Sequence, residues 1–219
     1  MKTEEELKLI AAQLRKPHGD HAQKVADMMV EGNASLYQNT LPVLNLSADE
    51  HILELGMANG YFVPTMFNIE PSIQYTGLDF SPEMVEEAKR NMQNFEHRNS
   101  IRFVCGDMNS MPFIDASFDC VFTVNTIYFW EESKAQLAEI KRVLKPEGRL
   151  VIAGRPKHIM DEMAFADFGF EKYTSEKLHA LLTENDFLNV EVQEIPEPST
   201  NFNDEEFVLA SLIGMGRTK

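Results

Sequence analysis

Five short apolar runs, separated by segments with helical spacing, dominate the middle of the chain. They cover residues 51–55, 73–78, 101–105, 118–124 and 149–153. Helix-like patterns lie between them: one follows Gly60, one begins at Ser81 and one begins at Ser133. This repeated order of strand and helix predicts a parallel sheet with right-handed crossovers. Because the runs are apolar almost throughout, we expect helices on both faces, which is a doubly wound α/β fold.

The first part of the chain is helical in pattern. Residues 3–14 place apolar side chains on one face, and Thr3 precedes them as a candidate N-cap. Further helices are expected at residues 21–30 and about 34–44. These helices would form an N-terminal cap ahead of the sheet.

The last part of the chain changes character. Residues 155–171 have no clean period and are rich in Met and Phe. A helix is predicted from Thr174 or Ser175 to about residue 185, followed by strands at 189–195 and 206–213. The sheet would then have about seven mostly parallel strands, with the last one antiparallel.

Polar residues follow four of the predicted strands at or near the point where each strand ends. They are Glu54, Asp79, Asp107 and Asn125. In an open parallel sheet, ligands bind at the carboxyl ends of the strands. We therefore expect these side chains to meet along one edge and to form a binding site there.

A turn rich in small residues follows the first strand, with Gly56, Ala58 and Gly60 at alternate positions. Glycines let a ligand approach the backbone closely, and the helix that follows presents unpaired N–H groups. Glu54 would repel a phosphate but suits an ammonium or hydroxyl group. The turn therefore favours a zwitterionic or sugar-bearing ligand over a polyphosphate.

Composition excludes several classes of function. The 219 residues carry a formal net charge of −15, which disfavours a general role on DNA or RNA. No apolar run approaches the ~20 residues that cross a bilayer, and the acidic N-terminus does not resemble a signal peptide. A cytoplasmic location is the simplest expectation.

Cysteine and histidine positions do not indicate a disulfide or a metal site. Cys105 and Cys120 lie in apolar runs and are expected to be buried free thiols. His18 and His21 flank Asp20 in a short polar stretch that fits a solvated turn better than a metal centre. We expect no metal.

Five motifs, taken together and in order, resemble those of the class I S-adenosylmethionine-dependent methyltransferases, most closely the small-molecule branch called methyltransferase type 11. They are residues 52–60 (ILELGMANG), 77–84 (GLDFSPEM), 106–113 (GDMNSMPF), 117–125 (SFDCVFTVN) and 140–152 (IKRVLKPEGRLVI). The resemblance implies a Rossmann-like fold with S-adenosyl-L-methionine as cofactor. It also implies one domain whose parts are a helical cap (1–46), a cofactor-binding core (47–154) and a substrate-side and C-terminal part (155–219).

The resemblance also implies roles for individual residues. Gly56, Ala58 and Gly60 would pass beneath the methionine part of the cofactor, with Glu54 near its ammonium group. Asp79 would accept both ribose hydroxyls. Phe80 and Met108 would pack on the adenine, Asp107 would accept its exocyclic amine, and Asn125 would lie near the methionine end or the sulfur. Met84 belongs to the same set of cofactor contacts. Family members usually have glycine where this chain has Ala58, and alanine costs about 1 kcal/mol if φ is positive there.

The methyl acceptor is expected to be a small molecule with an apolar or aromatic body, methylated by in-line displacement. Tyr128 and Trp130 would wall the substrate side of the site, although packing of their loop is an equal alternative. Tyr37 and the segment at residues 160–170 would form a lid, or else a homodimer contact. His158 is more simply a loop histidine, and we assign no catalytic base.

Two other functions remain open. A non-catalytic protein of the same fold could bind S-adenosylmethionine, because fold does not determine function. An NAD-dependent oxidoreductase is less favoured, because the turn from Gly56 to Gly60 lacks the glycine pattern that binds a pyrophosphate.

Overall fold

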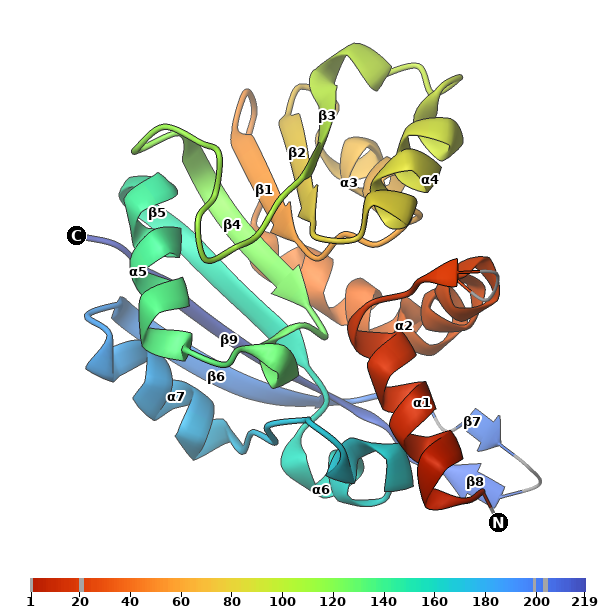
Figure 1. The fold of residues 1–219 in the computed structure, drawn as a ribbon. Coiled ribbons are helices and arrows are strands. Elements are labelled where there is room, and N and C mark those ends of the chain that lie inside the picture. Colours follow the sequence, from red (N-terminus) through yellow and green to blue (C-terminus); the bar gives the residue numbers. More distant parts are fainter. Residues whose placement is uncertain (1, 20–21, 199, 203–204) are drawn as a thin grey trace.

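The computed structural model describes residues 2–19, 22–198, 200–202 and 205–219, and its centre is a seven-stranded sheet (Figure 1). The strand order is β3-β2-β1-β4-β5-β9-β6. The strands are β1 (His51–Leu55), β2 (Gln74–Asp79), β3 (Ile101–Cys105), β4 (Phe118–Val124), β5 (Leu144–Gly154), β6 (Leu188–Pro196) and β9 (Ala210–Arg217). Strands β1 to β5 pair in parallel, and β9 pairs antiparallel with both β5 and β6. The predicted fold class, including the antiparallel last strand, is confirmed.

Helices cover both faces of this sheet (Figure 1). The α-helices of the described residues are α1 (Glu4–Arg15), α2 (Ala22–Leu44), α3 (Val63–Ile69), α4 (Pro82–Met92), α5 (Ser133–Val143), α6 (Lys157–Asp161) and α7 (Ser175–Glu184). On one face Leu53 and Leu55 of β1 belong to the same buried cluster as residues of α5 and α7, whereas on the other Ile52 shares a cluster with residues of α2 and α3. This alternation follows from the two-residue period of a strand.

Local sequence signals explain several helix boundaries. Thr3 caps α1 in a reciprocal capping box with Glu6. Ser81 accepts a hydrogen bond from the backbone N–H of Met84, and Pro82 occupies the first position of α4. Thr174 caps α7 in the same way. These boundaries agree with the prediction because the capping residues act within one turn.

The prediction of two helices between residues 21 and 44 is wrong. A single helix, α2, begins at Ala22 among the described residues and continues to Leu44. Gly32 does not interrupt it, because tertiary contacts hold the helix there: the guanidinium of Arg155 donates to the Gly32 carbonyl at 2.9 Å. His21 and Asp20 lie outside the described residues.

Three further expectations need correction. The run at residues 206–213 is divided between β8 (Glu205–Phe207), which pairs with β7 (Thr200–Phe202) in a separate hairpin, and β9. Strand β5 begins at Leu144 rather than Arg149, since Leu144 already pairs with Phe118 before a bulge. Cys105 is exposed, because β3 is the edge strand, whereas Cys120 is buried as expected.

Candidate functional site

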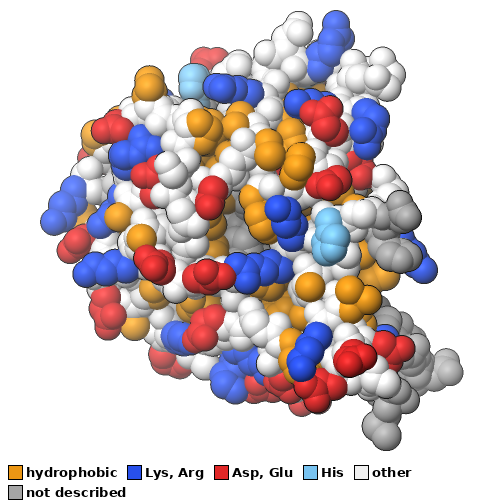
Figure 2. Space-filling view, viewed as in Figure 1, with side chains coloured by type: hydrophobic (Ala, Val, Ile, Leu, Met, Phe, Trp, Pro, Cys, Tyr) orange, Lys and Arg blue, Asp and Glu red, His pale blue; other side chains and the backbone are white. Residues whose placement is uncertain are grey.

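A cavity of about 200 Å³ opens at the carboxyl ends of β1, β2, β3 and β4. Most of the predicted site residues line it, namely Gly56, Ala58, Met84, Asp79, Phe80, Asp107, Met108, Asn125 and Trp130. Glu54, Gly60, Tyr37 and Tyr128 do not line it. Hydrophobic side chains are exposed in the middle of the face that Figure 2 shows, whereas charged side chains dominate its periphery.

The turn after β1 has three residues in the left-handed region of the backbone. Gly56, Ala58 and Gly60 have φ values of 74°, 49° and 69°. At Gly56 a Cβ atom would lie 2.4 Å from the Thr126 side chain, so only glycine fits. The alanine at position 58 therefore does adopt the strained conformation that glycine would adopt freely. Its methyl group packs against Ala22 and Ala26 of α2.

Asp79 connects this turn to the start of α4. One carboxylate oxygen accepts a hydrogen bond from the Ala58 N–H at 3.0 Å, and the other accepts one from the Ser81 N–H at 2.9 Å. The side chain is 7% exposed, and burial raises the pKa of its carboxyl. Each oxygen keeps a lone pair, so the buried carboxylate can still accept hydroxyl donors from the cavity that it lines.

Glu54 points away from the cavity, because it lies on the opposite face of β1 from Leu53 and Leu55. Its two carboxylate oxygens accept hydrogen bonds from the hydroxyls of Tyr37 and Tyr75, each at 2.5 Å. Burial raises the pKa of Glu54 to about 7. Tyr37 is itself buried and stacks on Phe62 at 3.8 Å between ring centroids. Glu54 and Tyr37 therefore lie on the α2 side of β1 and support the turn after β1 from the side away from the cavity.

Three residues at the ends of β2 and β3 form the outer wall. The Phe80 ring is 43% exposed, with the Lys16 ammonium 4.9 Å from its centre. Asp107 is exposed, and its Oδ1 accepts hydrogen bonds from both the backbone and side-chain N–H groups of Asn109, at 2.8 and 2.7 Å. Met108 is half-buried against the core on the α5 side.

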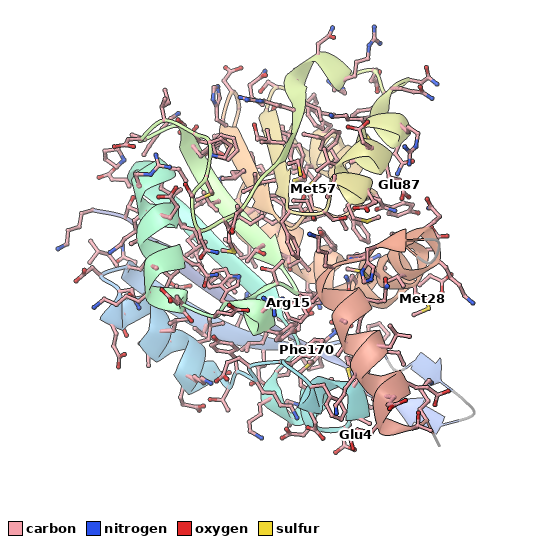
Figure 3. All side chains as sticks on the ribbon, viewed as in Figure 1. Glu4, Arg15, Met28, Met57, Glu87 and Phe170 are labelled. Atoms are coloured by element: carbon pink, nitrogen blue, oxygen red, sulfur yellow. The ribbon has the colours of Figure 1, made fainter. Side chains whose placement is uncertain are left out.

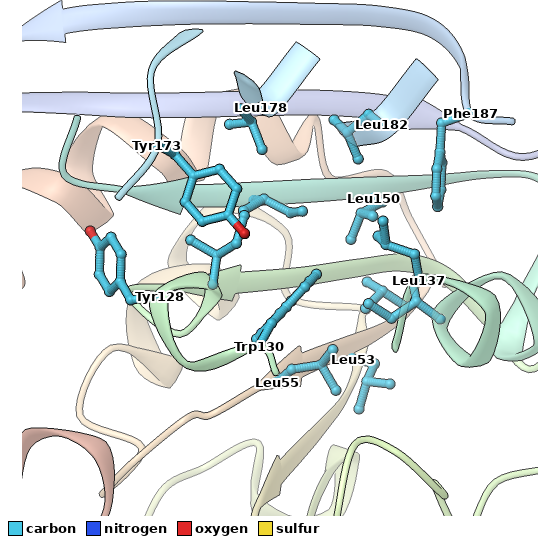
Figure 4. Packing of buried hydrophobic residues seen from close by; sticks show 14 of the residues in the cluster. Leu53, Leu55, Tyr128, Trp130, Leu137, Leu150, Tyr173, Leu178, Leu182 and Phe187 are labelled. Atoms are coloured by element: carbon cyan, nitrogen blue, oxygen red, sulfur yellow. The ribbon is translucent and has the colours of Figure 1, made fainter. Parts of the chain in front are cut away.

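A polar network fixes the end of β4. The Asn125 amide donates to Asn33 of α2 at 2.7 Å and accepts from the Tyr128 hydroxyl at 2.8 Å. The Tyr128 hydroxyl also accepts a hydrogen bond from the Arg155 backbone N–H. Tyr128 is thus a buried core residue within the short helix at Ile127–Phe129. Trp130 is buried as well, and Figure 4 shows it close to Leu55.

A second cavity, of about 640 Å³, adjoins the first. Arg15, Phe129 and Trp130 line both cavities, and Tyr128 and Phe170 line the second one. Figure 3 shows Arg15 at the end of α1, near Phe170. The Arg15 guanidinium pairs with Glu131, so α1 is held across the boundary between the two cavities.

Sequence reasoning missed several residues of the first cavity. The N-terminal helices and their connection contribute Leu14, Pro17 and Met29, and α5 contributes Gln136. No motif marks the first three residues, since they reach the sheet edge only through tertiary packing. Gln136 is 4% exposed, and its Oε1 has no hydrogen-bond partner among the residues that the structure describes. Gln136 lies four residues before the apolar Ile140, and a glutamine at this border of the apolar helix face was the available signal.

Two searches of the described residues gave negative results. No helix in that part of the chain is long and apolar enough to cross a bilayer. No group of three or more His, Cys, Asp or Glu side chains there is placed to hold a metal ion.

Comparison with known proteins gives a consistent result. Residues 53–152 match the family model described as a methyltransferase domain. Over 130 residues the chain is 28% identical to an uncharacterized methyltransferase of Bacillus subtilis, YdaC. The aligned region covers 59% of this chain and 70% of that protein. It is 33% identical to a demethylmenaquinone methyltransferase of Thermotoga maritima over 103 residues, 47% of this chain and 42% of that one.

Residues 53–152 therefore form a methyltransferase domain, and the matching relatives and solved structures support a class I S-adenosylmethionine-dependent methyltransferase. The crystal structure of the YcgJ protein from Bacillus subtilis shares the fold of this chain, with a TM-score of 0.68 at 19% identity, covering 85% of this chain and 99% of that one. The matched region spans between 33% and 70% of the length of the curated relatives.

The residues around the first cavity fit S-adenosyl-L-methionine, the cofactor that the family match and the structural neighbours imply. The buried Asp79 carboxylate suits the ribose diol, and the unpaired Gln136 Oε1 offers a further acceptor. The apolar walls that Phe80 and Met108 provide suit a purine. The volume of about 200 Å³ is below the roughly 300 Å³ of the smallest usual ligand sites. Leu14 and Met29 of the N-terminal helices line the same cavity.

Proposed function

We propose that this chain transfers a methyl group from S-adenosylmethionine to a small acceptor by in-line displacement. When bound, the cofactor supplies an electrophilic methyl group on a sulfonium. The observation that carries the proposal is the buried Asp79 carboxylate, which joins the turn at Ala58 to the cap of α4 while lining the cavity. This carboxylate can receive two neighbouring hydroxyls without moving, which is the preorganisation that a ribose site needs.

The chain's own contribution to the reaction is positioning and the exclusion of water. The turn from Gly56 to Gly60 would hold the amino-acid part of the cofactor, with Glu54 and Tyr37 bracing that turn from the α2 side. Phe80 and Met108 would cover the base. Leu14, Met29 and Trp130 form apolar walls that would keep water from the site once it is filled. A reaction of this kind needs no strong base when the nucleophile is an acidic carbon, thiol or phenol.

We further propose that the acceptor occupies the second cavity and has an apolar or aromatic body. Support comes from the walls that Phe129, Trp130 and Phe170 provide and from the two side chains, Phe129 and Trp130, that face both cavities. Aromatic walls favour planar, apolar ligands. The net charge of −15 argues against a nucleic-acid acceptor. We propose that residues 1–219 act together as one domain.

Asp79 provides the test. Calorimetric titration with S-adenosylhomocysteine should show binding to the wild-type protein and an affinity about 100-fold lower for Asp79→Asn, because two charge-assisted hydrogen bonds are weakened. Asp167→Asn is the control, since that exposed side chain pairs only with Lys172 among its described neighbours. Equal affinities for wild type and Asp79→Asn would refute the assignment.

Transfer itself needs a separate measurement. Wild-type protein should move labelled methyl groups to at least one member of a panel of phenols, thiols and activated carbon acids. Binding of S-adenosylhomocysteine without transfer to any acceptor class would favour the non-catalytic alternative. Binding of NAD in its place would favour the oxidoreductase.

A further inference from the structure

The side chain of Gln136 is buried in the first cavity with an unused acceptor. It is 4% exposed, it lines the cavity, and its Oε1 accepts no hydrogen bond from any residue that the structure describes. Buried carbonyl oxygens without a partner cost stability and are rare in folded proteins. A ligand that donates a hydrogen bond to this oxygen would remove that cost.

Neighbouring contacts on α5 show which end of the cavity Gln136 faces. Glu139, three residues later on the same helix face, accepts a hydrogen bond from the Met111 N–H at 2.8 Å. Arg142, a further three residues on, donates to the Met111 and Phe113 carbonyls. This face of α5 therefore follows the loop after β3. Gln136 lies one turn earlier, toward the preceding loop residues Met108 and Asn109, which line the same cavity.

That end of the cavity is suited to a flat heterocycle. Leu78, Phe80 and Met108 supply apolar surface there, whereas Trp130, which bonds Thr126 beside Gly56, belongs with the turn after β1 at the other end. Of the three parts of the cofactor, the base is the one that apolar walls favour. Asp107 is the less available acceptor, since its exposed Oδ1 already receives two hydrogen bonds from Asn109.

We propose that the Gln136 carboxamide recognises the edge of the cofactor's adenine, with Oε1 accepting from the exocyclic amine and the amide N–H donating to an adjacent ring nitrogen. This inference rests on the proposed function. Adenine presents a donor beside an acceptor, and the glutamine amide presents the complementary pair. Gln136 is then a specificity-determining residue of the cofactor site. It lies in the first half of α5, which none of the sequence motifs covers.

A double-mutant cycle between protein and ligand tests the contact. Two ligands are titrated by calorimetry: S-adenosylhomocysteine and its analogue with hydrogen in place of the 6-amino group. Wild-type protein should bind the analogue about 5- to 100-fold more weakly, the usual range for leaving a buried acceptor unpaired. In Gln136→Leu the ratio of the two dissociation constants should fall to about 1, since the acceptor is gone.

Stability provides the control for folding. Replacing an unpaired buried amide with an apolar side chain of similar size should leave the melting temperature unchanged or higher. Gln136→Met is a second variant, with an unbranched side chain, and its ratio of the two dissociation constants should also be about 1. Gln74→Leu should keep the wild-type ratio, because Gln74 is exposed at the start of β2, at the end of the strand that lies away from the cavity.

The outcomes separate this inference from the proposed function. Wild-type protein that binds neither ligand would refute the proposed function, and this inference with it. A wild-type protein that binds both ligands equally would overturn the inference alone. So would a Gln136→Leu variant that keeps the wild-type ratio.

Discussion

The buried carboxyl of Glu54 should make the stability of this protein fall as the pH rises from about 4.5 to 7. Burial raises the pKa of Glu54 from 4.5 to about 7; the nearby Asp79 charge adds to this rise, and the hydrogen bonds from Tyr37 and Tyr75 oppose it. The folded protein therefore binds this proton more tightly than the unfolded chain does. The stabilisation is fully present below pH 4.5 and is lost as the pH rises through 7.

The size of the effect follows from the difference between the two pKa values. Each pH unit is worth about 1.4 kcal/mol, so a rise from 4.5 to about 7 corresponds to roughly 3 kcal/mol. Glu54→Gln removes the titration but keeps a side chain that can bond both tyrosine hydroxyls. Urea unfolding at pH 5 and pH 8 would measure the free energy of unfolding of both proteins. Carboxyl groups that do not interact with Glu54 contribute equally to each and cancel in the comparison, whereas the nearby Asp79 does not cancel fully.

Relative to wild type, Glu54→Gln should gain up to roughly 3 kcal/mol between pH 5 and pH 8. Tyr75→Phe serves as a second probe, because it removes a hydrogen bond that favours the charged carboxylate. It should therefore destabilise the protein more at pH 8 than at pH 5. Parallel pH dependences for wild type and Glu54→Gln would refute the reasoning, since they would mean that Glu54 titrates alike in the folded and unfolded chains.

Three further predictions concern packing and cofactor entry. Trp130→Ala should lower the free energy of unfolding by about 3–5 kcal/mol, because the ring is buried in the core; a loss below about 1 kcal/mol in denaturant titrations would contradict this packing. Ala58→Gly should change the free energy of unfolding by no more than about 1 kcal/mol. Relief of left-handed strain, about 1–2 kcal/mol, is offset by the loss of a methyl contact with α2 and by the greater freedom of glycine in the unfolded chain. A larger change in either direction in thermal unfolding would contradict this balance. Tryptic cleavage after the exposed Arg15 should slow when S-adenosylhomocysteine is saturating, because the N-terminal helices that line the cavity close over the ligand; unchanged cleavage at full occupancy would count against a lid.

Short-range signals made much of the sheet predictable. Strands β1, β3 and β4 begin and end at the predicted residues, because each is an apolar run bounded by turn residues. The convergence of Asp79, Asp107 and Asn125 on one cavity followed from parallel topology alone. The roles assigned to these residues stay predictions.

The rest depended on contacts between distant parts of the chain. Two helices were expected between residues 21 and 44, but they form one, α2, and the Arg155 side chain, distant in sequence, donates to the Gly32 carbonyl near its middle. Tyr128 was expected at a site wall and does line the second cavity, but the network of its hydroxyl with Asn125 and Arg155 was not predictable, because only the folded strand ends bring these groups together. The position of Glu54 was readable in principle, because strand alternation places it opposite Leu53 and Leu55.

A crystal structure of the protein with S-adenosylhomocysteine tests the central claim most directly. The account predicts the ligand in the cavity at the ends of β1 to β4, with both ribose hydroxyls within hydrogen-bond distance of the Asp79 carboxylate. A ligand bound elsewhere, with this cavity left empty, would contradict it.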